Sequence, residues 1–349
     1  MDCYKEVTFL LDQAYGGSSA AHSPPPSPLS ATIASTAMEQ PSASIGDVKK
    51  DAKWLLKASL DSDDTLLHVA IYDWMLQRDL HAELLHTTQL SSRQGQASVK
   101  NSLETYLRRA SERDPDSLPI QDLLWKYYES ISDHASAAKV LQGLANSASA
   151  AITLSQRVTY LARAVMCMRS DQVGCAPSLG VFLKQLEDEL DVVRIQQKVL
   201  DALKGVRHTN QHKAEEAIRR LESELVDIGV LFDAYAEPFG LWECQLAIIY
   251  CSGYQDPPLL ENIWENILDA ELANTSAASS PDNRMRLLLA KVTALGNECS
   301  LSPRCFPLAY LTRQLEIRCC RLKADPAIVS SELTSLGIAL PKLIDIYDK

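Results

Sequence analysis

The stretch from Asp63 to Leu85, DDTLLHVAIYDWMLQRDLHAELL, constrains the fold of this chain more than any other segment. Its apolar residues cover most of a helix circumference; they are Leu66, Leu67, Val69, Ala70, Ile71, Trp74, Met75 and Leu76. Apolar side chains on most sides are typical of a helix that is packed between neighbouring helices. Because much of the remaining sequence has the same character, we expect helices to pack on helices along most of the chain.

The amino-acid composition also favours helices over strands. Of the 349 residues, 46% are hydrophobic and only 6% are aromatic, and glycine occurs 13 times. Leu and Ala are the commonest apolar residues, and they lose little rotamer freedom in a helix. We therefore predict an all-α protein. No fixed repeat of about 34 or about 40 residues is present, so the predicted architecture is an irregular α-solenoid of stacked antiparallel helix pairs.

Charge and cysteine content argue against several classes of function. The formal net charge of −11 disfavours a surface that binds nucleic acid or anionic lipid, because both need clustered Lys and Arg. The nine cysteines are odd in number and form no CxxC pair, which indicates neither a disulfide framework nor a zinc site. No signal peptide or membrane-spanning run of about 18 to 20 apolar residues is found. We expect reduced, mostly buried thiols in a cytosolic or nuclear protein.

The chain divides into three parts by sequence character. Residues 1–15 have the pattern of an N-terminal helix, and residues 16–46 form a Ser/Pro/Ala-rich segment that we interpret as a disordered linker or an insertion. Residues 47–349 are predicted to form the α-solenoid. Since both ends of the chain have helical character without a capping signal, we expect it to be a fragment of a longer protein.

Two long apolar stripes follow one another in the middle of the chain. The first contains Leu179, Leu183, Leu186, Leu190, Val193 and Leu200, interrupted only by the polar Gln197. The second contains Ala214, Ile218, Leu221, Leu225, Ile228, Phe232 and Tyr235 and ends at Pro238. Both keep alternating steps of three and four residues, which is typical of long helices that pack along a seam. The short connection between them predicts one long antiparallel helical hairpin.

The sequence contains no recognisable catalytic, cofactor-binding or metal-binding constellation. His81 and His86 are five residues apart and so cannot face one metal from a helix, and the signatures of nucleotide binding and acyl transfer are missing. The carboxylates of Glu187, Asp188, Glu189 and Asp191 lie outside the apolar stripe and are interpreted as a charged outer face. We therefore predict no enzymatic activity and no cofactor.

Aromatic side chains are the remaining candidates for a binding role. Most of them fit packing between adjacent helices, but buried aromatic rings also anchor short peptides in grooves. Tyr254 and Trp264 flank the turn from Gln255 to Pro258. They are our candidate partner-binding residues.

Several blocks of sequence carry a resemblance to a known family. They are LLHVAIYDWMLQRDLHAELL, DLLWKYYE, SAAKVLQGLA, ESELVDIGVLFDAYAEPFGLWECQLAIIYCSGYQDP, PRCFPL and LGIALPKLIDIYD. In this order, over nearly the whole chain, they resemble the large inner-ring scaffold nucleoporin of the nuclear pore complex, the one-fifty-five/one-seventy class.

The resemblance implies a structural role at the nuclear pore complex in the nuclear envelope, supporting nucleocytoplasmic transport. Members of the family have an N-terminal β-propeller followed by an α-solenoid, and this chain resembles part of the C-terminal solenoid. The implied partners are other nucleoporins, especially linker nucleoporin peptide segments. We expect no nucleic-acid partner, no small-molecule substrate and no direct contact between this segment and the membrane. A helical adaptor or coat-type solenoid in membrane traffic is the alternative, because a helical fold does not fix function.

Overall fold

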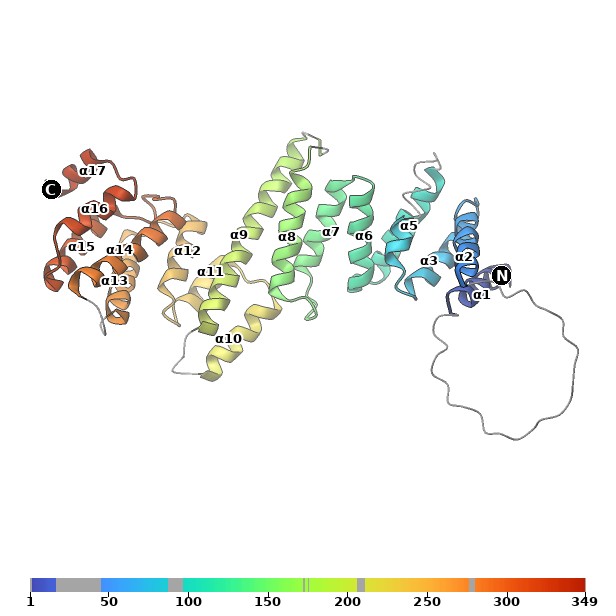
Figure 1. The fold of residues 1–349 in the computed structure, drawn as a ribbon, viewed down its shortest axis with the longest axis horizontal. Coiled ribbons are helices and arrows are strands. Elements are labelled where there is room, and N and C mark those ends of the chain that lie inside the picture. The colour runs from blue at the N-terminus through green and yellow to red at the C-terminus, as the bar shows by residue number, and fades with distance from the viewer. Residues whose placement is uncertain are drawn as a thin grey trace, which may run out of the picture. The chain divides into compact units, whose positions relative to one another are not determined.

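The computed structural model describes residues 2–16, 45–86, 97–171, 173–174, 176–205, 211–275 and 280–348. Every regular element in these ranges is a helix (Figure 1), so the all-α prediction is confirmed. The chain forms two compact units, one of Met1–Leu144 and Met166–Cys175 and the other of Ala145–Val165 and Ala176–Lys349. Apart from three residues that belong to the flanking helices, the Ser/Pro/Ala-rich segment lies outside the described residues.

Short helices that pack on their neighbours make up the first unit. They are α1 (Asp2–Gly16), α2 (Ile45–Leu60), α3 (Thr65–Leu76), α5 (Ala97–Arg113), α6 (Leu118–Ser130) and α7 (His134–Asn146, whose last two residues belong to the second unit). Residues 81–86 are also helical. Asp64 caps α3 by accepting hydrogen bonds from the amides of Leu66 and Leu67. The indole Nε1 of Trp74 donates to a carboxylate oxygen of Asp12 at 2.6 Å, which joins α3 to α1.

The side chains of α3 that are buried differ in part from those that the sequence predicts to be buried. Its buried residues are His68, Ile71, Tyr72, Trp74 and Met75. Leu66 is 66% exposed and Val69 is exposed as well, because α1, α2 and α5 pack on only part of the helix. The polar His68 is buried instead, and its Nδ1 lies 3.2 Å from the hydroxyl of Ser102. The prediction of a helix covered on most sides therefore holds for only one part of its surface.

The second unit contains the longest helix of the described residues and a packed C-terminal array. Its elements are α8 (Leu154–Met168, whose last three residues belong to the first unit), α9 (Pro177–Gly205), α10 (Gln211–Ser223), α11 (Ile228–Val230), the π-helical η1 (Leu231–Ala236), α12 (Trp242–Ser252), α13 (Pro257–Asn274), α14 (Pro281–Glu298), α15 (Leu308–Leu322), α16 (Ala327–Ser335) and α17 (Leu340–Tyr347). Proline stands in the first turn of α13, α14 and α17, where its missing N–H costs no helical hydrogen bond.

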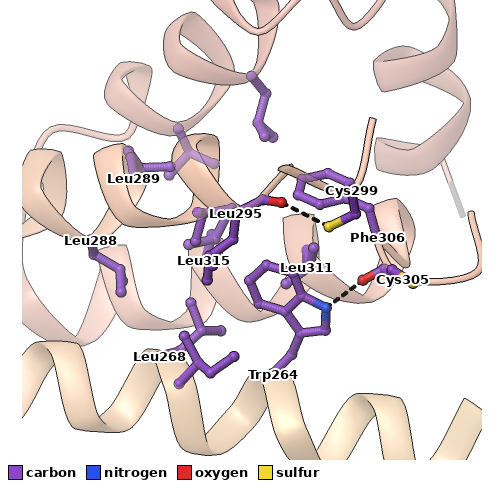
Figure 2. Close-up of a cluster of buried hydrophobic side chains, with 14 of the residues drawn as sticks. Trp264, Leu268, Leu288, Leu289, Leu295, Cys299, Cys305, Phe306, Leu311 and Leu315 are labelled. Atoms are coloured by element: carbon purple, nitrogen blue, oxygen red, sulfur yellow. Dashed lines mark hydrogen bonds between the residues drawn. The ribbon is translucent and has the colours of Figure 1, made fainter. Parts of the chain in front are cut away.

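A continuous core joins α12 to α17. Trp264 lies at its centre among leucines of α13, α14 and α15 (Figure 2). The indole Nε1 of Trp264 donates to the carbonyl oxygen of Cys305 at 2.7 Å, and its ring meets Phe306 edge-on with 5.7 Å between centroids. Burial raises the pKa of the Cys299 and Cys305 thiols to about 11. These two cysteines are therefore protonated at neutral pH, and their burial agrees with the sequence prediction that most of the thiols are buried.

The predicted long hairpin has only one continuous arm. Its first arm is α9, which buries Leu186, Leu190, Val193 and Leu200 as expected. The second arm begins as α10 but ends at Ser223, and the chain resumes helical structure only at Ile228. The prediction of an uninterrupted second helix as far as Pro238 is thus wrong.

Two buried polar side chains explain why the second arm breaks. Gln196 of α9 is fully buried; its Nε2 donates to the carbonyl oxygens of Leu221 and Glu224 at 2.8 and 2.7 Å, and its Oε1 accepts from the amide of Val226 at 3.0 Å. Arg157 of α8, 1% exposed, donates to the carbonyl oxygen of Ser223 at 3.0 Å. In a continuing helix, the backbone groups of this segment would bond to one another. Here the side chains of Gln196 and Arg157 bond to them instead, so these groups are satisfied although the helix ends.

Candidate functional site

A long groove lies along the N-terminal half of α9. We call it the α9 groove; it has a volume of about 980 Å³ and belongs entirely to the second unit. One wall consists of nine α9 residues between Pro177 and Val193, and the other consists of Asn146 and residues 225–228 at the break after α10. The break therefore forms part of the groove.

The α9 wall of this groove is one open face of the helix. Its residues recur every three or four positions, which is the spacing of side chains on one side of an α-helix. Val181 is 71% exposed on this face. A Cβ atom at Gly180 would meet no other atom within 4 Å. The face can therefore accept side chains from outside the molecule.

Carboxylates outnumber cations along the α9 groove. Asp188, Glu189 and Asp227 line it, together with one basic residue, Lys184. The ammonium group of Lys184 donates to Asp188 at 2.8 Å, and this hydrogen bond raises the pKa of Lys184. Around this acidic strip lie the apolar side chains of Val181, Val192, Leu225, Val226 and Ile228. The combination suits a partner that has both aliphatic and basic side chains.

A second, smaller groove contains the predicted Tyr254. This Tyr254 groove has a volume of about 350 Å³ and is lined mainly by apolar residues of η1, α12 and α13, including Phe232, Ile249 and Leu259. Tyr254 is 57% exposed at its rim, directly after the left-handed Gly253 that ends α12. Ile228 lines both grooves, so the break after α10 contributes to each.

The other predicted site residue, Trp264, does not lie at the surface. Its side chain is 0% exposed, and its only polar hydrogen, on Nε1, is donated to Cys305. The structure therefore assigns Trp264 to the core and separates it from Tyr254. The residues of the α9 groove are not among the predicted site residues, because the carboxylates there are interpreted from the sequence as a charged outer face.

Within the described ranges, no group of three or more His, Cys, Asp and Glu side chains is arranged to hold a metal ion. In the same part of the chain, no helix combines the length and the apolar character needed to cross a membrane. We consider the α9 groove and the Tyr254 groove as candidate binding surfaces.

Comparison with known proteins establishes the family. The model of the non-repetitive/WGA-negative nucleoporin C-terminal family matches residues 1–349, the whole chain. The chain belongs to this nucleoporin family. The resemblance read from the sequence blocks is thereby confirmed.

Curated nucleoporins are similar to the chain over most or all of its length. Nuclear pore complex protein Nup154 of Drosophila melanogaster is 36% identical over 100% of the chain and 24% of its own length. Probable nucleoporin C890.06 of Schizosaccharomyces pombe is 30% identical over 72% of the chain and 18% of its own length. The chain thus spans about a quarter or less of these curated relatives.

Solved structures of a nucleoporin share the fold. The Nup170 CTD–Nup145N complex of Chaetomium thermophilum matches with a TM-score of 0.74 at 17% identity, over 99% of this chain and 63% of that one. Nup170 SOL of the same organism matches with a TM-score of 0.70 at 18% identity, over 86% of this chain and 42% of that one. At these identities the likeness concerns the fold alone, and it confirms the predicted helical solenoid class.

Proposed function

We propose that this chain is a structural scaffold segment of the nuclear pore complex inner ring that binds segments of linker nucleoporins. The observation that carries the proposal is the 36% identity to Nup154 over the full length of the chain. The complex of Nup170 CTD with Nup145N supports a nucleoporin as partner, because Nup170 CTD has the same fold as this chain. Support of nucleocytoplasmic transport follows from this position.

The second unit provides what a scaffold of this kind requires. Its core fixes α12 to α17, while the Tyr254 groove and the α9 groove stay open at the surface. A preformed groove loses little conformational entropy when a flexible segment binds, so more of the contact energy appears as affinity. We propose Tyr254 as one contact of such a segment, because a partly exposed tyrosine offers both an apolar ring and a hydroxyl.

The same proposal assigns neither an enzymatic step nor a cofactor to this segment, and it assigns membrane contacts of the pore to other segments. The net charge of −11 is consistent with a protein partner rather than nucleic acid.

Imaging of the full-length parent protein, tagged at its own gene, tests the proposal. We expect a punctate nuclear rim that coincides with a known pore component, and co-purification of other nucleoporins from nuclear extract. A vesicular pattern would favour the alternative of a coat-type adaptor in membrane traffic. Recovery of no pore component from the extract would count against the scaffold role.

A further inference from the structure

We propose that the α9 groove binds a helical segment of a partner protein that has aliphatic side chains at helical spacing and lysine or arginine residues between them. The inference rests on the proposed function, because it names the chemistry of the partner segment for one surface of the scaffold. Three properties of the groove support it: an open helix face, the shape of its walls, and its charge.

The open face results from the break in the hairpin. Gln196, near the middle of α9, contacts the carbonyl oxygens of Leu221 and Glu224, so α10 ends at the middle of α9. Along the N-terminal half of α9, from Pro177 to Val193, the groove is consequently bordered by the non-helical residues 225–227 and by Ile228 rather than by a continuous second helix. A helix from another molecule can occupy the place that an uninterrupted second arm would have taken.

The walls favour a helix over an extended peptide. The lining positions on α9 run from Pro177 to Val193, a stretch of 17 residues that measures about 24 Å at a rise of about 1.5 Å per residue. An extended peptide cannot bind here by pairing with the edge of a sheet, because the described residues contain no strand. An amphipathic helix instead places its apolar side chains in a groove between helices.

The charge identifies the partner's polar residues. Asp188, Glu189 and Asp227 line the groove, and Lys184, the basic residue among them, already donates to Asp188. An approaching acidic segment would therefore meet carboxylates, whereas a basic segment would be attracted. The net charge of −11 disfavours a second copy of this chain as the occupant for the same reason.

Three labelled peptides with the purified 349-residue chain test the proposal by fluorescence anisotropy. The first has leucines at helical spacing with lysines elsewhere, the second has glutamates in place of the lysines, and the third is the lysine peptide with two central prolines. We expect the lysine peptide to bind at least tenfold more tightly than either of the others and to weaken as salt is raised. Equal binding of the lysine and glutamate peptides would overturn the charge assignment, and equal binding of the proline peptide would overturn the helix.

Two pairs of variants show whether the peptide lies in this groove. Gly180→Leu adds a side chain on the groove face at a position where a Cβ atom meets nothing within 4 Å, and Gly205→Leu does so at the far end of α9, where the same holds. Asp188→Lys reverses a charge in the groove, while Asp345→Lys changes the net charge equally at an exposed position on α17. We expect Gly180→Leu and Asp188→Lys to weaken binding of the lysine peptide at least fivefold, and both controls to change it less than twofold.

Other outcomes overturn the inference in recognisable ways. Equal effects of Asp188→Lys and Asp345→Lys would mean attraction to the whole acidic chain rather than to the groove. Self-association of the wild-type chain in sedimentation that Gly180→Leu abolishes would make a second copy the occupant. Failure of peptide binding while the tagged parent protein still marks the nuclear rim would overturn this inference and leave the proposed function intact.

Discussion

Trp264 makes two kinds of contact in the core, and substitutions can separate them. Trp264→Phe keeps an aromatic ring next to Phe306 but leaves the carbonyl of Cys305 without its donor, which is expected to cost about 1–3 kcal/mol. Trp264→Ala also leaves a cavity and is expected to cost about 3–5 kcal/mol. Urea unfolding followed by circular dichroism measures both. Wild-type stability in Trp264→Phe would show that the hydrogen bond contributes nothing.

At Tyr254 the expected effect is on binding rather than on stability. Tyr254→Ala removes a ring that is 57% exposed at the rim of its groove, so stability should change by less than about 0.5 kcal/mol. If the ring anchors a linker nucleoporin segment, affinity should fall about tenfold or more in calorimetry. Tyr250→Ala is the matched control, because Tyr250 is 43% exposed and does not line the groove. Equal losses in the two variants would remove Tyr254 from the site.

The buried thiols predict a dependence of stability on pH. Burial raises the pKa of Cys244, Cys299 and Cys305 to about 11, whereas an unfolded thiol ionises near pH 8.5. Between these values the unfolded state loses protons that the folded state retains, so the contribution of these thiols to stability should be constant below about pH 8 and fall as pH rises to about 11. Urea unfolding at several pH values measures this. Replacing all three with alanine should flatten the decline above pH 8, and an unchanged decline would contradict the assignment.

At the scale of elements, the break between α10 and α11 is held by buried side chains of other helices, and Gln196 makes more of these contacts than Arg157 does. Gln196 makes three hydrogen bonds to the backbone of this segment. Gln196→Leu removes all three and leaves buried polar groups unpaired, with an expected loss of about 2–4 kcal/mol. Gln197→Leu is the control, because the Gln197 side chain bonds to Asp201 on the exposed side of α9.

Thermal or urea unfolding of the two glutamine variants decides this point. We expect Gln197→Leu to lie within about 0.5 kcal/mol of the wild-type chain. Similar losses in both variants would mean that the break does not rely on Gln196. An increase of helical circular dichroism in Gln196→Leu would indicate that α10 continues through residues 224–227, and the variant should then also bind less of any segment that occupies the α9 groove.

The helices show which features of the fold follow from sequence alone. Apolar spacing predicts a long helix through Leu179 to Leu200, and α9 is found at Pro177–Gly205. The same rules fail after Ser223, because the apolar stripe continues there while the hydrogen bonds that end the helix come from Gln196 and Arg157, distant in sequence. Local periodicity contains no information about such contacts. The polar Gln197 interrupts the stripe in the sequence, but its neighbour Gln196 is the buried residue.

The candidate site was predictable only in part for a similar reason. Tyr254 and Trp264 flank the same turn, and only packing separates the exposed ring from the buried one. The carboxylates near Asp188 were interpreted as a solvated outer face, which describes their charge correctly. That this face borders a groove depends on where residues 225–228 lie after the break. The α9 groove therefore results from where residues 225–228 lie in three dimensions, which the residue types on α9 do not reveal.

At the scale of the whole molecule, we expect that this chain can replace the matching segment of a relative without loss of the fold. The chain is 36% identical to Nup154 over its full length, and the fold persists in Nup170 at 17% identity. Packed cores tolerate many substitutions when volume and apolar pattern are kept. A Drosophila Nup154 in which this chain replaces the matching segment should therefore fold and reach the nuclear rim.

Rim fluorescence of the tagged chimera, normalised to its expression, measures this outcome. We expect at least half of the signal of tagged Nup154. A chimera that also contains Trp264→Ala should lose most of it, because a loss of about 3–5 kcal/mol is a large share of the stability of an ordinary domain. A chimera that is well expressed and soluble but absent from the rim would show that this segment needs contacts specific to its own partners. The two grooves would then be the first surfaces to exchange, by restoring the Nup154 residues there.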